Sequence, residues 1–203
     1  MSRGLDANVD LTAHAKCIKD AGFSFVCRYY KRTASSLSRA EAMALSAAGL
    51  NVVVVVEIGS PTTAGYFSRA KGVEHGTFAY RKARDTIRQP PGSAIYFAAD
   101  YDVSQADASG PVKAYFEGVL QGFNAESGDD PAYSIGVYSN GLACAYLLRH
   151  TAVTYAWLSM STGFRGSRTF KGWNLHQLVG DRICGVSVDT DVSNGHGGGF
   201  RVA

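Results

Sequence analysis

Two carboxylates, one residue apart, follow an apolar run near the middle of the chain. The stretch "SAIYFAADYDVS" spans residues 93–104 and places Asp100 and Asp102 after a predicted buried strand. Side chains alternate along a strand, so both aspartates are expected on one face, with Ala98. Close carboxylates suit acid–base chemistry, because like charges raise the pKa of one group and keep it protonated. The pair could equally cap the following helix, and taken alone it favours neither interpretation.

Acidic groups also end other predicted strands. Asp6 follows the first apolar run, Glu57 the third and Asp189 the last. In a barrel of parallel strands the carboxyl ends meet at one rim, and active sites lie at that rim. The sequence therefore predicts a cluster of catalytic carboxylates there. Asp191 is interpreted as a turn or cap residue rather than a catalyst.

Residues suited to binding a sugar lie near the same strand ends. Aromatic rings offer flat apolar surfaces, and planar amides can bind hydroxyl or acetamido groups. The candidates for substrate binding are Arg28, Tyr29, Tyr138, Asn140, Trp157 and Gln177. With 11 Tyr and 10 Phe in the chain, each aromatic candidate is as readily a core residue. Arg28 could be a structural counter-charge.

The elements that must position these residues alternate along the chain. Strand-like and helix-like segments imply βα units on a mostly parallel sheet, covered on both faces. The expected strands span residues 4–8, 23–30, 51–58, 94–100, 133–140, 155–160, 174–179 and 185–192, and the expected helices span residues 11–21, 38–48, 73–87, 111–124 and 142–149.

Eight strands in 203 residues predict an α/β fold, a small single-domain (β/α)8 barrel of the TIM type with some helices shortened or missing. The barrel is expected over residues 1–195, and "NGHGGG" indicates a flexible tail over 196–203. A doubly wound open sheet is the alternative, but "GLDANVD" is not the Gly-rich phosphate loop that such a sheet carries after its first strand.

Composition narrows the function classes. The net charge of +3 is small and dispersed, so no nucleic-acid partner is expected. No apolar run is long enough to span a membrane. The N-terminus shows no signal peptide, which predicts synthesis in the cytoplasm and action on a cell wall after lysis or dedicated secretion. A monomer is expected.

The four cysteines are Cys17, Cys27, Cys144 and Cys184. They lie far apart without zinc-ligand spacing, so we expect four free thiols, no metal and no cofactor.

At these motifs the chain resembles a glycoside-hydrolase-like family known as domain of unknown function 1906, which is similar to the glycoside hydrolase family 25 lysozymes. The matching pieces are "GLDAN", "AGFSFVCRYY", "GTFAYRKARDTIRQPPGSAIYFAADYD", "IGVYSN", "AWLS" and "HQLVGDRICGVSVDTDVSN". The lysozyme pattern has an Asp after strand one, a D-x-E pair after strand four and an Asp after strand eight. Carried over, these are Asp6, Asp100 with Asp102, and Asp189. Asp102 stands where the lysozymes have Glu.

The resemblance implies a glycoside hydrolase of lysozyme (muramidase) type that cleaves bacterial peptidoglycan. Such a reaction needs one protonated and one ionised carboxyl group. Asp102 is expected as the general acid, tuned by Asp100, with Asp6 or Asp189 supplying negative charge. Because Asp is one methylene shorter than Glu, Glu57 is a second candidate for the acid.

Two other functions stay open at this point. One is a catalytically silent barrel that binds glycan, and the other is a glycosidase for a different polysaccharide. A phage endolysin and a secreted effector both fit the sequence.

Overall fold

Eight strands close into one barrel in sequence order, as the alternating pattern predicts. The structure is a computed structural model that describes residues 1–127 and 131–203. The strands are β1 (Ser2–Asp6), β2 (Phe25–Tyr30), β3 (Asn51–Val56), β4 (Ala94–Ala98), β5 (Ser134–Ser139), β6 (Val153–Leu158), β7 (Leu175–Ile183) and β8 (Val186–Ser193). Each falls on a predicted strand, which confirms the fold class.

The last strand runs against the others. Strands β1 to β7 pair in parallel, whereas β8 is antiparallel to both β7 and β1. Only Cys184 and Gly185 connect β7 to β8, and both have positive φ. Two residues can close a hairpin but cannot cross over to a parallel strand. The first half of β8 therefore lies at the mouth of the barrel, and Asp189 reaches that mouth from within the strand rather than from its end.

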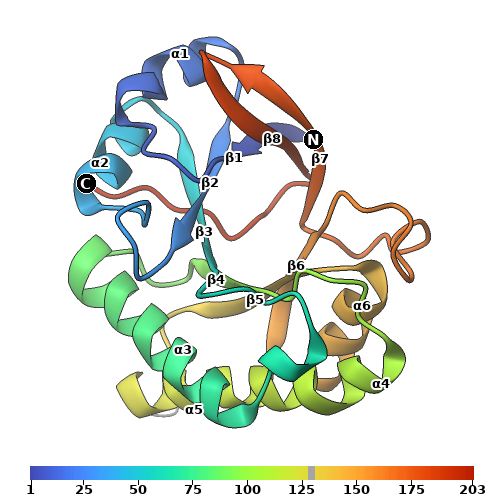
Figure 1. The fold of residues 1–203 in the computed structure, drawn as a ribbon. Coiled ribbons are helices and arrows are strands. Elements are labelled where there is room, and N and C mark those ends of the chain that lie inside the picture. Colours follow the sequence, from blue (N-terminus) through green and yellow to red (C-terminus); the bar gives the residue numbers. More distant parts are fainter. Residues whose placement is uncertain (128–130) are drawn as a thin grey trace.

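Helices cover only part of the barrel (Figure 1). The α-helices are α1 (Ala15–Asp20), α2 (Arg39–Ala47), α3 (Arg69–Arg81), α4 (Gln105–Asp107), α5 (Lys113–Ser127) and α6 (Gly141–His150). Short 3-10 helices span Thr12–His14 and Ala64–Tyr66, and π-helical segments span Lys82–Ile87 and Ala108–Val112. No helix lies between β6 and β7 or between β7 and β8, so the expectation of missing helices holds within the described residues.

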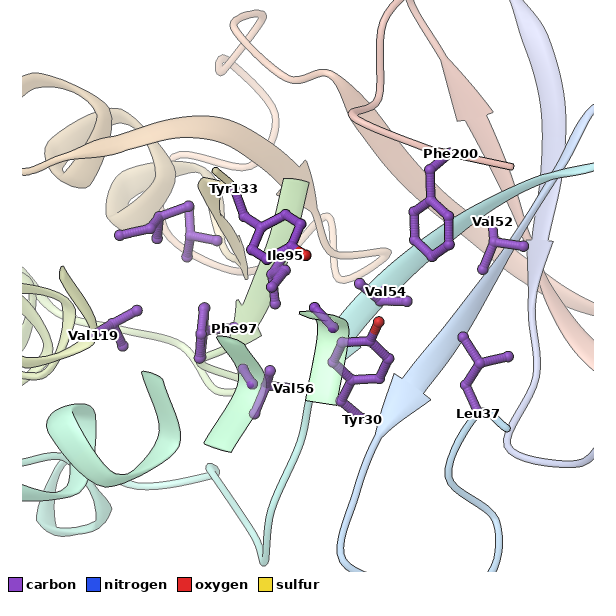
Figure 2. Close-up of a cluster of buried hydrophobic side chains, with 14 of the residues drawn as sticks. Tyr30, Leu37, Val52, Val54, Val56, Ile95, Phe97, Val119, Tyr133 and Phe200 are labelled. Carbon is purple, nitrogen blue, oxygen red and sulfur yellow. The ribbon is translucent and has the colours of Figure 1, made fainter. Parts of the chain in front are cut away.

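Two apolar clusters follow from the alternation of side chains along the strands. Outward-facing residues such as Val54 and Phe97 pack with the helices in the larger cluster (Figure 2). Inward-facing residues such as Cys27, Tyr96 and Trp157 fill the barrel itself. The barrel is thus a packed core, and its functional residues lie on top of that packing.

The C-terminal segment is not a flexible tail. Residues 196–203 cross from β8 to the side of α2 (Figure 1), where Phe200 exchanges two backbone hydrogen bonds with Val52 of β3, at 2.8 and 2.9 Å. The Ala94 N–H also donates to Gly198 O at 2.8 Å. Phe200 is buried. The Gly-rich stretch is ordered because its backbone pairs with two strands, which composition alone does not reveal.

The prediction of four free thiols is wrong. Cys17 of α1 and Cys184 of the β7–β8 turn form a disulfide, although 167 residues separate them in sequence. Cys27 and Cys144 are buried free thiols. Closure of the barrel brings the last hairpin onto the first helix, and sequence spacing gives no sign of that approach.

Candidate active site

A cavity of about 310 Å³ opens at the mouth of the barrel, where the parallel strands end. Its lining combines carboxylates, aromatic rings and an amide: Tyr29, Val55, Glu57, Ala98, Asp100, Tyr138, Trp157, Met160, Ser161, Gln177 and Asp189. Seven strands or their following loops contribute to this wall. Of the sequence-predicted site residues, Glu57, Asp100, Asp189, Tyr29, Tyr138, Trp157 and Gln177 therefore meet in one cavity.

Three carboxylates face this cavity. Glu57 forms an ion pair with Lys31, with Oε1 and Nζ 3.1 Å apart. Burial raises the pKa of Asp100, and the negative charge of Glu57 adds to that effect. Burial also raises the pKa of Asp189. The arrangement keeps Asp100 and Asp189 easier to protonate than ordinary aspartates, next to a glutamate that is paired with a cation.

Asp6 lies behind the wall rather than on it. It accepts hydrogen bonds from Tyr29 Oη at 2.9 Å and from Gln177 Nε2 at 2.8 Å. Tyr138 Oη in turn donates to Gln177 Oε1 at 2.7 Å. Burial raises the pKa of Asp6 to about 6, although the hydrogen bonds from Gln177 and Tyr29 oppose the rise. This network fixes the orientation of three side chains that line the cavity.

Asp191 is a functional candidate that the sequence analysis set aside as a turn or cap residue. It is 1% exposed, and its Oδ1 accepts a hydrogen bond from Trp157 Nε1 at 2.8 Å. Its Oδ2 is buried without a partner in the described part of the chain. Burial raises the pKa of Asp191 well above the ordinary value, and the charge of Asp6 adds to this. The turn interpretation was wrong because Asp191 lies within β8, two residues from Asp189 and on the same inward face.

Asp102 does not line the cavity. Its Oδ2 pairs with Arg165 Nη1 at 2.6 Å, and its Oδ1 accepts hydrogen bonds from Arg165 N at 2.7 Å and Asn140 Nδ2 at 3.1 Å. Strand β4 ends at Ala98, so the alternation that would keep Asp102 on the face of Asp100 does not extend that far. The structure thus brings Asp100 to the cavity and holds Asp102 beside it in an ion pair.

Two predicted binding residues have structural roles instead. Asn140 is buried and caps α6, accepting a hydrogen bond from Ala143 N at 2.9 Å while its amide group donates to Asp102 and Val103. Arg28 is buried and forms an ion pair with Glu41, with Nε and Oε1 2.6 Å apart. It points outward because its neighbours Cys27 and Tyr29 occupy the inward face of β2.

Other kinds of site find no support in the described residues. Across residues 1–127 and 131–203, no group of three or more His, Cys, Asp or Glu side chains could hold a metal ion. In the same part of the chain, no helix has both the length and the apolar character needed to cross a membrane.

Residues 16–193 match a protein family described as Rv2525c-like, glycoside hydrolase-like domain. A curated relative is the uncharacterized protein FadG of Bacillus subtilis, which is 27% identical over 194 residues, or 89% of this chain and 33% of FadG. This chain therefore spans about a third of the length of that relative.

Solved structures share the fold. The Tat-secreted protein Rv2525c of Mycobacterium tuberculosis superposes with a TM-score of 0.74 at 22% identity, covering 98% of each chain. A bacterial lysozyme from Streptomyces coelicolor superposes with a TM-score of 0.56 at 16% identity, covering 96% of this chain and 92% of the lysozyme. The spore cortex lytic enzyme SleM of Clostridium perfringens gives a TM-score of 0.64 at 10% identity, covering 95% of this chain and 67% of SleM.

The comparison with Rv2525c corrects one expectation about location. That protein is described as Tat-secreted. The finding contradicts the prediction, read from the N-terminal residues, of a protein that has no signal peptide and leaves the cytoplasm by lysis or a dedicated route. The disulfide between Cys17 and Cys184 agrees with the correction, since disulfides persist in oxidising compartments.

Proposed function

Because the chain belongs to the Rv2525c-like, glycoside hydrolase-like domain family, we propose that it is a lysozyme-type glycoside hydrolase that cleaves bacterial cell-wall peptidoglycan. The observation that carries the proposal is the convergence of Glu57, Asp100 and Asp189 on one cavity at the barrel mouth. The likeness in fold to a lysozyme and to a spore cortex lytic enzyme supports the same substrate class.

The three carboxylates have different roles in the proposed reaction. Asp100 is the proposed general acid, because burial and the charge of Glu57 raise its pKa while it faces the cavity. It donates its proton to the leaving glycosidic oxygen as the bond to the anomeric carbon breaks. Glu57 and Asp189 supply negative charge to the oxocarbenium-like centre. Water then completes the hydrolysis and returns a proton to Asp100.

The rest of the lining binds the sugar. Tyr29, Tyr138 and Trp157 offer ring surfaces, and Gln177 is held in place by Asp6 and Tyr138. Rigid positioning of this kind matters because catalysis is sensitive to misplacement by about 1 Å. Asp6 and Asp191 act as positioning residues. Asp6 holds Gln177 and Tyr29 in place, and Asp191 holds Trp157.

Replacement of Asp100 by Asn tests the proposal. The release of reducing ends from purified peptidoglycan should fall by at least about 10²-fold, the usual scale of general acid catalysis, while glycan binding persists. Wild-type activity should decline as pH rises through the raised pKa of Asp100, because the donor must be protonated. Asp102→Asn is the matched control, since it removes one carboxylate next to the cavity and should leave most of the activity.

The opposite result, an inactive Asp102→Asn variant beside an active Asp100→Asn variant, would move the acid to Asp102. If both variants stay active, Glu57→Gln becomes the deciding substitution.

A second candidate function is glycan binding without cleavage. The ion pair between Asp102 and Arg165 favours this second function. Asp102 stands where the lysozyme pattern has its Glu, and here its carboxylate is occupied by an arginine. Wild-type protein that sediments with cell walls yet releases no reducing ends at any pH would establish this alternative.

A further inference from the structure

A second groove, of about 460 Å³, lies between α6 and the segment that joins β6 to β7. Its lining consists of Gln105, Gly141, Leu142, Ala145, Tyr146, Arg149, His150, Gly166, Thr169, Phe170 and Lys171. It shares no residue with the mouth cavity. The two are neighbours along the chain, since Ser161 lines the cavity and Gly166 lines the groove. Arg165, which pairs with Asp102, lies between these two positions in the sequence.

The groove is built on fixed contacts. Leu142 N donates to Arg165 O at 2.9 Å, and Gly141 N donates to Ser167 Oγ at 3.2 Å, so the β6–β7 segment is fastened to the start of α6. A Cβ at Gly166 would lie 2.6 Å from Leu142 N. The close approach of the two backbones therefore requires glycine there, and the shape of the groove depends on it.

Most of the positive charge around this groove has no carboxylate partner among the described residues. From Pro131 to Gly180 the sequence contains no Asp or Glu, whereas it contains Arg149, Arg165, Arg168 and Lys171. In the part of the chain that the structure describes, Arg165 alone of these four has a carboxylate partner, Asp102. Arg149 and Lys171 are exposed and line the groove. Positively charged side chains without neighbouring carboxylates raise the local concentration of an anionic ligand at such a surface.

Aromatic rings lie among these cations. The rings of Tyr146 and His150 are tilted by 35° with centroids 4.4 Å apart, and Phe170 lines the same groove. Small apolar groups can pack on the rings while carboxylates pair with Arg149 and Lys171. A short peptide that alternates methyl groups with carboxylates fits this combination better than a uniform phosphodiester chain does.

We propose that this groove binds the carboxylate-bearing peptide arms of the polymer whose glycan strand enters the mouth cavity. The identity of that polymer rests on the proposed function, whereas the anionic peptide chemistry rests on the groove itself. The glycan occupies the cavity, the peptide arm passes the Asp102–Arg165 pair, and its carboxylates meet Arg149 and Lys171. The groove then selects peptide-bearing strands over bare ones.

The test compares the binding of three soluble probes by calorimetry. They are a peptidoglycan disaccharide carrying a peptide with free carboxylates, the same fragment with amidated carboxylates, and the peptide-free disaccharide. The doubly substituted variant Arg149→Gln/Lys171→Gln should weaken binding of the free-carboxylate fragment by about tenfold and leave the other two unchanged. Added salt should weaken the same probe most.

The matched control is the doubly substituted variant Lys19→Gln/Arg88→Gln. It removes the same charge from exposed positions in α1 and directly after the π-helical segment Lys82–Ile87, and neither residue lines the cavity or the groove. Its affinity for all three probes should equal that of the wild type.

The outcomes separate this inference from the proposed function. Equal affinity of the wild type for the free and the amidated fragments would overturn the groove assignment, while binding of the bare disaccharide would still support the glycan site.

Binding of the free peptide alone, sensitive to Arg149 and Lys171, would support the groove and count against the glycan site. Tighter binding of poly(glycerol phosphate) at the same residues would overturn the peptide assignment, and failure of every probe would overturn both proposals.

Discussion

At the scale of single residues, two buried acids behind the lining of the mouth cavity are held by neutral hydrogen-bond donors. Asp6 accepts hydrogen bonds from Tyr29 and Gln177, and Asp191 accepts one from Trp157. Neither acid has a cation as a hydrogen-bond or ion-pair partner among the described residues, in contrast to Asp102 with Arg165. Burial without a cation is why the pKa of each rises. The result is a site that aligns side chains at a cost to stability at neutral pH.

Asp6→Asn should flatten the pH dependence of stability. The folded pKa of Asp6 is about 6, above the ordinary 3.8, so its protonated form favours folding. This contribution is complete below pH about 4 and disappears as pH rises through about 6. The wild type should therefore lose about 2 kcal/mol more unfolding free energy between pH 4 and 7 than the variant loses. Urea titrations at a series of pH values measure the difference, and identical profiles would contradict it.

At the scale of elements, the β7–β8 hairpin carries much of the site. It supplies Gln177, Asp189 and Asp191, and β8 pairs with β1 so that Asp189 lies opposite Asp6. In the described structure no helix packs extensively on β7 or β8, so this hairpin has less helix packing than β3, β5 and β6 have. The disulfide between Cys17 and Cys184 fastens its turn to α1 instead.

Removal of this disulfide should loosen the hairpin. The double variant Cys17→Ser/Cys184→Ser should lose about 2–4 kcal/mol of unfolding free energy, the usual range for a native disulfide. Reductant should lower the stability of the wild type by a similar amount and leave the variant unchanged, which makes the variant its own control. Thiol titration of the denatured, unreduced protein should count two groups, from Cys27 and Cys144. A count of four would contradict the disulfide.

At the scale of the whole molecule, the C-terminal segment packs against the end of the barrel where strands β3 and β4 begin, opposite the mouth. Phe200 is buried and pairs with Val52, and Gly198 with φ +70 lies against Ala94. A Cβ at Gly198 would lie 2.4 Å from the Cβ of Ala94, so only glycine permits this approach. The segment ties β3 and β4 to α2, where Val202 N donates to Ser46 Oγ at 3.0 Å.

Phe200→Ala should therefore destabilise the entire barrel rather than free a dispensable tail. A buried Phe replaced by Ala costs about 3–5 kcal/mol. Phe164→Ala, at a half-buried position in the β6–β7 segment, should cost clearly less. Denaturant unfolding of both variants measures the contrast, and equal stabilities would show that the C-terminal segment contributes little.

The sequence by itself determined the elements and the family. Alternating apolar patterns located all eight strands, and polar residues at strand ends indicated Glu57, Asp100, Tyr138 and Gln177, which the structure brings to one cavity. These features depend on local alternation and on the rule that parallel strands end at one rim. Both can be read within a short window of residues.

Only the tertiary structure decided which of two neighbouring aspartates faces the cavity. Asp102 is directed away by Arg165, a residue 63 positions later, and Cys17 meets a cysteine 167 positions later. The direction of β8 follows from a two-residue turn, and that direction carries Asp191 into the core beside Trp157. The disulfide in particular depends on closure of the barrel, because closure brings the two ends of the chain within reach of each other.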